Sequence, residues 1–507
     1  MTISAEQYTA WLAQDGVART ILIEVGCNYN GSEITRYLSN YGYVTRSTET
    51  PANTHYVARL QGTITFSRRV AITSTESPVQ LTMSSIELDN LDGELDTWLD
   101  DAWEKRPLKA FIGDPSWDRA DFRQIFAGRA SSLVPSGKEK LTLNIYDEMQ
   151  RLNFPVTETV LGGTSINKAA ILPLTFGEVF NASPLLIDPA LHTYKIHNGT
   201  IESILEVRDN GALLDNIGNT AYTVNLTAGT FTLLHSPAGQ IQCDAQGYKT
   251  SGGVYVNTIS NIIKEIVTVY GSADTRLLSS EIDTSNFSTF EAANPQALGI
   301  YLFDKTNVID ACNMLAKSLQ ASLYFSRLGK LRLWRPPTTT GVSVKTFNTN
   351  SMEANSFRVV EVLPASPAVT LGWGKNWTAQ MSSLAGGLPE SSSTELSTEW
   401  REYSVSDSAA ITLHRYTNIP NQEDTALIDE TEAQVEAAKR LLFRKVPHKI
   451  IEFNTTASAM ELELGDEVTI IHPRNGCANG KNGWIIGIEE VHGSSNTPFS
   501  VKLEVVI

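Results

Sequence analysis

The segment 88–101, "LDNLDGELDTWLDD", gathers carboxylates that could bind a cation or act in acid/base chemistry. An EF-hand loop needs an acidic first ligand and a glutamate at its twelfth position. With Gly93 as the loop glycine, Leu88 and Leu99 fall at those two positions. Because both ends of the pattern fail, the segment is not an EF-hand.

The same carboxylates could also be tested as a hydrolase pair. Glycoside hydrolysis needs two carboxyl groups opposed across a cleft. Asp96 and Asp100 are four residues apart and would instead share one face of a helix. We therefore predict a solvated acidic turn and helix, with weak cation binding over 87–104 as the alternative.

Two other stretches contain residues suited to chemistry. His192 and His197 are five apart, and strand alternation would place them on opposite faces. The loop "GCANGKNG" (476–483) has three residues between its glycines where a P-loop has four, and Asn482 stands where the P-loop has Ser or Thr. HExxH and GxSxG are also missing from the sequence. We expect no catalytic, cofactor-binding or metal-binding residues, and no enzyme.

Composition restricts the class of protein further. Four single cysteines (Cys27, Cys243, Cys312, Cys477) have no zinc spacing, and they predict free thiols in a reducing cytoplasm. A net charge of −16 argues against tight wrapping of nucleic acid, which requires clustered positive charge. No apolar run is long enough to cross a membrane, and the first residues do not resemble a signal peptide. We expect no membrane anchor.

The elements that would position any site are mostly strands. Short strand patterns fill 21–160, a connector follows at 161–173, and an antiparallel meander occupies about 174–250. Asn210-Gly211 predicts a tight hairpin, because both residues tolerate positive φ. Beyond it, the alternating apolar residues of the meander predict a half-buried sheet (Tyr222, Val224, Leu226, Phe231 and Leu233).

Helical spacing appears at four places. Ser4 and Gln7 form a capping box before a short N-terminal helix. Buried stripes are predicted in two central helices, the first with Ile259, Ile262, Ile263 and Ile266, and the second with Val308, Cys312, Leu315 and Leu319. Asn307 is expected to cap the second of these helices. A hairpin turning at Leu328-Gly329 should follow.

The last third of the chain again predicts strands, with one helix from Thr431 to about Arg444. Thr431 and Gln434 have capping-box spacing, and Val435, Ala438 and Leu442 are its predicted buried stripe. The Gly/Ser-rich stretch 382–397 is predicted to be a mobile loop. "LKAFIGD…IFAGRASSL…LTLNIYD" near residue 140 is echoed by "LELGDEVTI…WIIGIEEV…VKLEVVI" at the C-terminus.

Several ordered phrases resemble the baseplate-hub or tail-tip hub proteins of long-tailed bacteriophages. They are "PLTFGEVFNASPLLID", "YKIHNGTIESILEVRDNGALL", "DKTNVIDACNMLAKSLQASLYFSRLGKLRL", "VTLGWGKNWT" and the terminal "LELGDEVTIIHP…GWIIGIEEV…VKLEVV". Each phrase is degenerate, and the signal comes from their order over residues 100–507. The first hundred residues match less clearly.

The resemblance implies a mainly β, multidomain fold with α+β elements and two related β-barrel domains of the tail-tube type. The expected domains are 1–165 (N-terminal helix and first barrel), 166–250 (β-meander), 251–338 (α+β) and 339–507 (second barrel with one helix). It also implies a homotrimeric ring that continues the tail tube and encloses the DNA channel.

The partners implied by the resemblance are a distal tail protein, a tape measure protein and a tail fibre or receptor-binding protein, with DNA only in transit. The expected location is the virion tail, after assembly in the host cytoplasm. The alternatives are a carbohydrate-binding or depolymerising tail spike, whose usual β-solenoid repeats are missing here, and another ring protein of the same tail.

Overall fold

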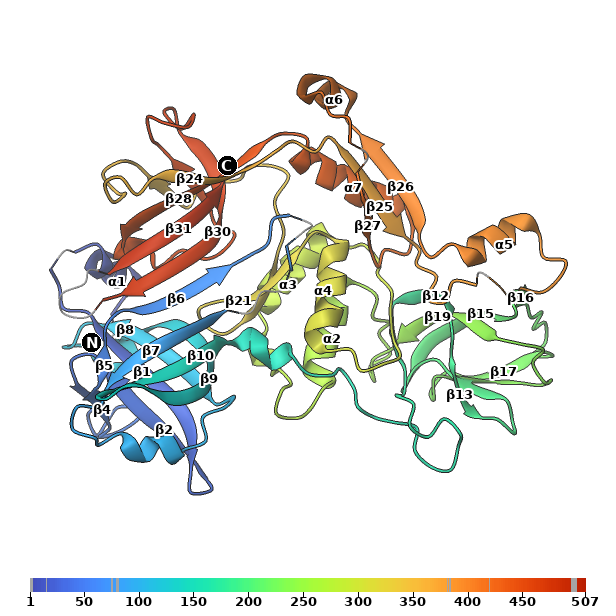
Figure 1. The fold of residues 1–507 in the computed structure, drawn as a ribbon, viewed down its shortest axis with the longest axis horizontal. Helices are drawn as coiled ribbons and strands as arrows, with labels where there is room; N and C mark the ends of the chain where they lie inside the picture. The colour runs from blue at the N-terminus through green and yellow to red at the C-terminus, as the bar shows by residue number, and fades with distance from the viewer. Residues whose placement is uncertain are drawn as a thin grey trace.

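The computed structural model describes residues 3–14, 16–73, 76–78, 82–380, 382, 384–418, 420–493 and 499–507. The fold is mainly β and multidomain, as predicted. In Figure 1 the N-terminal and C-terminal sheets lie one above the other, the central helices lie beside them, and the meander lies at the far end of the molecule.

The N-terminal sheet has the strand order β3-β4-β2-β1-β8-β9-β10-β7-β5. Its strands are β1 (Thr20–Tyr29), β2 (Ser32–Ser39), β3 (Tyr43–Val44), β4 (His55–Ala58), β5 (Leu60–Gln61), β7 (Met83–Asp89), β8 (Pro107–Gly113), β9 (Arg123–Gly137) and β10 (Lys140–Asp147). Three 3₁₀ turns, η1 (Asp96–Asp100), η2 (Arg119–Asp121) and η3 (Glu148–Leu152), accompany it. Helix α1 (Ala5–Leu12) begins with the predicted capping box of Ser4 and Gln7.

The C-terminal sheet has the order β23-β29-β30-β31-β28-β24. Its strands are β23 (Lys345–Phe347), β24 (Arg358–Leu363), β28 (His448–Thr456), β29 (Glu467–Ile470), β30 (Lys481–His492) and β31 (Ser500–Val506), with η5 (Ala457–Ala459) after β28. A strand from the N-terminal part of the chain, β6 (Ile64–Arg69), also pairs with β30. Both sheets contribute to a single hydrophobic core.

The two sheets share a strand order. β8, β9, β10 and β7 are neighbours in one sheet, and β29, β30, β31 and β28 are neighbours in the other, all antiparallel. This agrees with the order of strands in the sequence echo. The Gly-Asp pairs do not match, since Gly113-Asp114 follows β8 whereas Gly465-Asp466 precedes β29.

The meander forms two four-stranded sheets, β12-β19-β15-β16 and β13-β14-β18-β17. Their strands are β12 (Glu178–Ala182), β13 (Leu185–Asp188), β14 (Thr193–Lys195), β15 (Ile201–Asp209), β16 (Ala212–Leu213), β17 (Tyr222–Asn225), β18 (Thr230–Leu233) and β19 (Ile241–Tyr248). Asn210 and Gly211 have positive φ and join β15 to β16, as predicted. The predicted inward alternation fails at Val224 and Leu226, which are exposed because only Tyr222 of this edge segment reaches the core.

The central unit packs helices against short strands. Its elements are β11 (Leu174–Phe176), α2 (Ile259–Val269), η4 (Ser279–Glu281), α3 (Thr284–Ala293), β20 (Ile300–Leu302), α4 (Val308–Ser318), β21 (Ser322–Phe325) and β22 (Leu331–Trp334). The predicted stripes of α2 and α4 are buried, and Gly329 turns the hairpin between β21 and β22. Asn307 stands at the N-cap position of α4, but its side chain makes no capping hydrogen bond, contrary to the prediction, and its amide Nδ2 donates to Asn153 Oδ1.

The region before β28 differs from its prediction. It contains a small sheet of β25 (Ala368–Trp373), β26 (Arg401–Ser406) and β27 (Gln422–Asp424), and the helices α5 (Glu390–Ser397), α6 (Ser408–His414) and α7 (Glu430–Arg444). The prediction of a single helix in 339–507 is therefore wrong. Part of the stretch predicted to be a mobile loop is α5, whereas Ser383 of that stretch lies outside the described residues.

Helix α7 buries a different face from the one predicted. Asp429, rather than Thr431, caps it, accepting hydrogen bonds from the backbone N–H groups of Thr431 and Glu432. Val435 and Leu442 are each 46% exposed. The buried face carries Glu436 and Arg440, which pair with each other, so a count of apolar residues alone selected the wrong face.

The central helices give a direct test of packing. Leu315 and Ile263 are fully buried in the core between α2 and α4. Changing either residue to alanine should lower the free energy of unfolding by about 2–5 kcal/mol. The exposed neighbour Lys264 is the control, and Lys264→Ala should change it by less than about 0.5 kcal/mol in denaturant titrations. Equal effects at all three positions would contradict this placement of the helices.

Candidate assembly site

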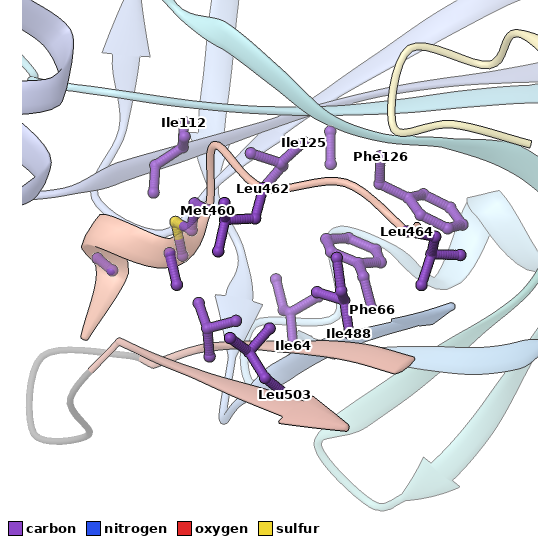
Figure 2. Close-up of a cluster of buried hydrophobic side chains, with 14 of the residues drawn as sticks. Ile64, Phe66, Ile112, Ile125, Phe126, Met460, Leu462, Leu464, Ile488 and Leu503 are labelled. Atoms are coloured by element: carbon purple, nitrogen blue, oxygen red, sulfur yellow. The ribbon is translucent and has the colours of Figure 1, made fainter. Parts of the chain in front are cut away.

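The contact between the N-terminal and C-terminal sheets joins distant parts of the chain through a strand pairing. β6 pairs with β30 in antiparallel register from Arg69↔Gly487 to Ile64↔His492. Ile64 and Phe66 of β6 then point into a cluster that includes Ile488 and Leu503 of the C-terminal sheet and Phe126 of β9 (Figure 2). The rings of Phe66 and Phe126 stack with their centroids 4.3 Å apart.

The loop that leads into β29 closes this cluster from another side. Met460, Leu462 and Leu464 lie between β6 and the strands that carry Ile112 and Ile125 (Figure 2). These residues come from both ends of the chain and form one core. Separating the two sheets would expose it, and burial of apolar surface is what opposes that exposure.

A buried ionic network crosses the same junction. Arg68 of β6 forms an ion pair with Glu463, and its guanidinium lies 3.6 Å from Glu490 of β30. Arg327, in the hairpin of the central unit, approaches Glu463 at 3.5 Å. His492 Nε2 lies 3.4 Å from Glu490. The network therefore joins three parts of the fold: strand β6, the C-terminal sheet with the loop before β29, and the hairpin between β21 and β22.

The charges of this network hold one another ionised. Burial alone would lower the pKa of Arg68, but Glu463 and Glu490 outweigh it and the pKa is raised. Burial would raise the pKa of Glu463, but Arg68 and Arg327 hold it below its usual value. The pKa of Glu490 is likewise lowered, against the effect of burial, by His492 and by the same two arginines.

Sequence reasoning overlooked these residues, although one signal was present. In "ITFSRR" the strand period of two places Arg68 on the same face as Ile64 and Phe66. A charge on the apolar face of a strand indicates a buried partner, since an unpaired buried charge is strongly unfavourable. The partner Glu463 lies 395 residues further along the chain, and Glu490 lies further still.

A second buried ionic cluster holds α7 against the central unit. Arg440 donates to Glu436 Oε1 at 2.7 Å, to Glu423 Oε2 at 2.6 Å, and to the carbonyl oxygens of Lys317 and Ser318 at the end of α4. A cavity of about 810 Å³ lies beside this cluster. Three charged groups on its wall pair with each other, since Glu423 binds both Arg440 and Arg444. These interactions hold α7 against the end of α4.

The residues considered for chemistry are not brought together. His197 is buried, its Nδ1 accepts a hydrogen bond from the Thr175 N–H, and burial lowers its pKa to about 3. His192 lies in a turn with positive φ. Neither is part of a strand, so the argument from strand alternation does not apply to them. Residues 476–480 lie in the loop between β29 and β30, as predicted, whereas 481–483 are the first residues of β30.

The acidic segment is held by arginines. Arg59 binds Asp92 at 2.7 Å and Glu94 at 2.6 Å, and Arg36 binds the buried Asp101 at 2.8 Å. The expected helix is the 3₁₀ helix η1, in which residues four apart do not share a face. Within the described ranges, no group of three or more His, Cys, Asp or Glu side chains is arranged to hold a metal ion.

Two expectations from composition concern the chain as a whole. All four cysteines are buried and free, as predicted. None of the described helices combines the length and the apolarity needed to span a membrane.

Comparisons with known proteins give no family. No family model matches the chain, and neither does any curated protein. Among solved structures, the tail protein from Neisseria meningitidis MC58 is 9% identical, with 97% of each chain covered and a TM-score of 0.41. Prophage tail protein gp18 from Listeria monocytogenes EGD-e is 8% identical, with 96% of this chain and 94% of that chain covered and a TM-score of 0.42.

The prophage MuSo2 43 kDa tail protein from Shewanella oneidensis is 9% identical, with 96% of each chain covered and a TM-score of 0.36. At such identities and scores these likenesses carry no argument about this chain.

Breaking the network at Arg68 should be costly. Arg68→Met would leave Glu463 and Glu490 buried without their main cation, and should lower the free energy of unfolding by about 3–5 kcal/mol. The matched control is Arg358→Met, since Arg358 pairs with Glu452 but is exposed. That change should cost less than about 1 kcal/mol in denaturant titrations. Similar losses in both variants would show that Arg68 does not fasten the sheets.

Acid should weaken the same junction. Since the pKa of Glu463 is lowered on folding from its ordinary value of 4.5, its stabilisation is complete above about pH 4.5 and is lost as the pH falls through the lowered value. A Glu463→Gln variant should therefore lose less stability than the wild type when acidified. Glu87→Gln, which removes half of an exposed pair with Lys140, is the control and should keep the wild-type slope. An unchanged slope in Glu463→Gln would contradict the assignment.

Proposed function

We propose that this chain is a structural hub at the distal end of a bacteriophage tail, where three copies form a ring that continues the tail tube and encloses the DNA channel. One observation carries the proposal. A single chain holds two sheets with the same strand order, joined through β6 on β30. Three such chains would supply six related units, which suits a ring below a sixfold tube. The ordered phrases that resemble hub proteins support the same conclusion.

The surface charges of these sheets are compatible with a DNA channel. DNA carries about one negative charge per 1.7 Å of its axis, so a basic wall would hold it. On the outward positions of the two repeated sheets, Lys140 pairs with Glu87, Lys502 with Glu489, and Arg69 with Glu504. These cations are neutralised where they stand, and the chain as a whole carries a charge of −16. A neutral or acidic wall allows DNA to pass.

The proposed role is structural and not enzymatic. It places the protein in the virion tail, after assembly in the host cytoplasm. Its partners would be a distal tail protein and a tape measure protein on the tube side, and a tail fibre or receptor-binding protein. DNA would be a partner only in transit.

Imaging of assembled tails by electron microscopy tests the proposal. We expect three copies of the chain in a ring at the tail tip, with an open channel whose wall is neutral or acidic. Six copies of the whole chain, a trimer without a channel, or a channel lined mainly by Lys and Arg would each contradict it.

A further inference from the structure

Within one chain, strand β30 has an edge along which β6 pairs. β29 pairs with the first part of β30, from Lys481 to Trp484, and β6 pairs with the later part, from Gly487 to His492. On the other edge, β31 pairs with β30 throughout this later part. β6 therefore fills the edge that β29 leaves open.

The N-terminal sheet has the matching edge on β9, where no described strand fills it, although the 3₁₀ helix η1 contacts β9. β8 pairs with β9 from Arg123 to Arg129, and Ala130 still exchanges hydrogen bonds with Lys105 and Arg106. From there to Gly137, β9 pairs with β10 on its other edge, and no described strand pairs with it on the β8 side. Val134, within this segment, is exposed. An unpaired strand edge is a template for another strand.

The donating strand also has a counterpart. β5 pairs with β7 at the edge of the N-terminal sheet, and the chain then continues along β7 into β6, where Ser84 Oγ donates to Thr65 O. In the C-terminal sheet, β24 occupies the position of β5, because it pairs with β28 as β5 pairs with β7. β24 is therefore the strand that should correspond to β5 and β6 together.

The matched residues differ in burial. The pairs Ile86–Leu143 and Phe453–Leu503 occupy equivalent places in the two sheets. From the place opposite each pair, we count residues along the edge strand, which is β5 followed by β6 in one sheet and β24 in the other. The bulge in β24 adds one residue to its count. By this count, Val362 takes the position of Phe66. Phe66 is 2% exposed because the other sheet covers it, whereas Val362 is 56% exposed.

We propose that β24 of one copy lies along the open edge of β9, between Ser131 and Gly137, in the next copy of this chain. Val362 would then be covered as Phe66 is covered within the chain. The contact is head-to-tail, and three such contacts close a ring. Pro135 lacks an N–H group and shortens the possible ladder, which restricts pairing to a few residues. This inference rests on the proposed function and adds to it the surfaces through which the copies meet.

Sedimentation velocity of the purified full-length protein over a range of concentrations is the first test. The wild type should reach a trimer, and Val362→Lys should remain a monomer, because it places a charge in the contact. Since Val362 is exposed in the single chain, the variant should keep the wild-type unfolding curve. Val254→Lys, at a valine that is 60% exposed on a loop next to the meander, is the matched control and should form the trimer.

Thiol cross-linking is the second test. A variant that carries both Val134→Cys and Val362→Cys should give covalent trimers with a short bifunctional thiol reagent. Each single variant should not, and the four native cysteines are buried. Trimers of Val362→Lys, or no cross-linking in a trimeric double variant, would overturn the pairing and leave the trimeric hub intact. A wild type that stays monomeric at every concentration would overturn the pairing as a property of this chain, whereas the hub itself is decided by the imaging of tails.

Discussion

The addition of β6 to the C-terminal sheet is the contact on which the rest of the architecture depends. The chain pairs with β7 as β5 and then continues as β6, which pairs with β30 of the other sheet, and so the two sheets share one core. Phe66 and Ile64 are buried only because strands from both ends of the chain meet around them. Any motion of one sheet against the other would break the pairing of β6 with β30 and, at the same time, expose this core to water. We therefore expect the two sheets to behave as one body.

Buried charge makes the junction specific. An apolar cluster alone would tolerate several registers of β6 on β30. Arg68 finds Glu463 and Glu490 together only in the observed register, and a slip by one residue would turn its side chain to the other face. Glu436 and Arg440 have the same role under α7, where Arg440 also binds carbonyl oxygens at the end of α4. Because buried ionic pairs add little net stability, their contribution is chiefly to select one arrangement.

The meander and the two large sheets contain much regular β-structure, and in the part of the chain that the structure describes no His, Cys, Asp or Glu cluster is arranged to hold a metal ion. Where charged residues meet in this fold, arginines and carboxylates pair with each other, as Arg59 does with Asp92 and Arg440 with Glu423. The histidine with the largest change of pKa, His197, accepts a backbone hydrogen bond inside the core.

Features set by residues near one another in the chain were predictable from the sequence alone. The capping box of Ser4 and Gln7, the Asn210-Gly211 hairpin and the apolar stripes of α2 and α4 depend on local geometry, which the spacing of side chains reports directly. The mainly β class followed from the same period-two patterns.

Tertiary structure decided the rest. The apolar residues of α7 predicted a buried stripe through Val435 and Leu442, but the helix turned Glu436 and Arg440 inward, because Glu423 and the end of α4 were there to pair with them. The sequence also did not predict that β6 pairs with β30, because a strand pattern shows which face of a strand is apolar and not which strand it will pair with. Both outcomes depend on partners far away in the sequence, and the free energy of a buried charge or an open strand edge is fixed only when those partners come into contact.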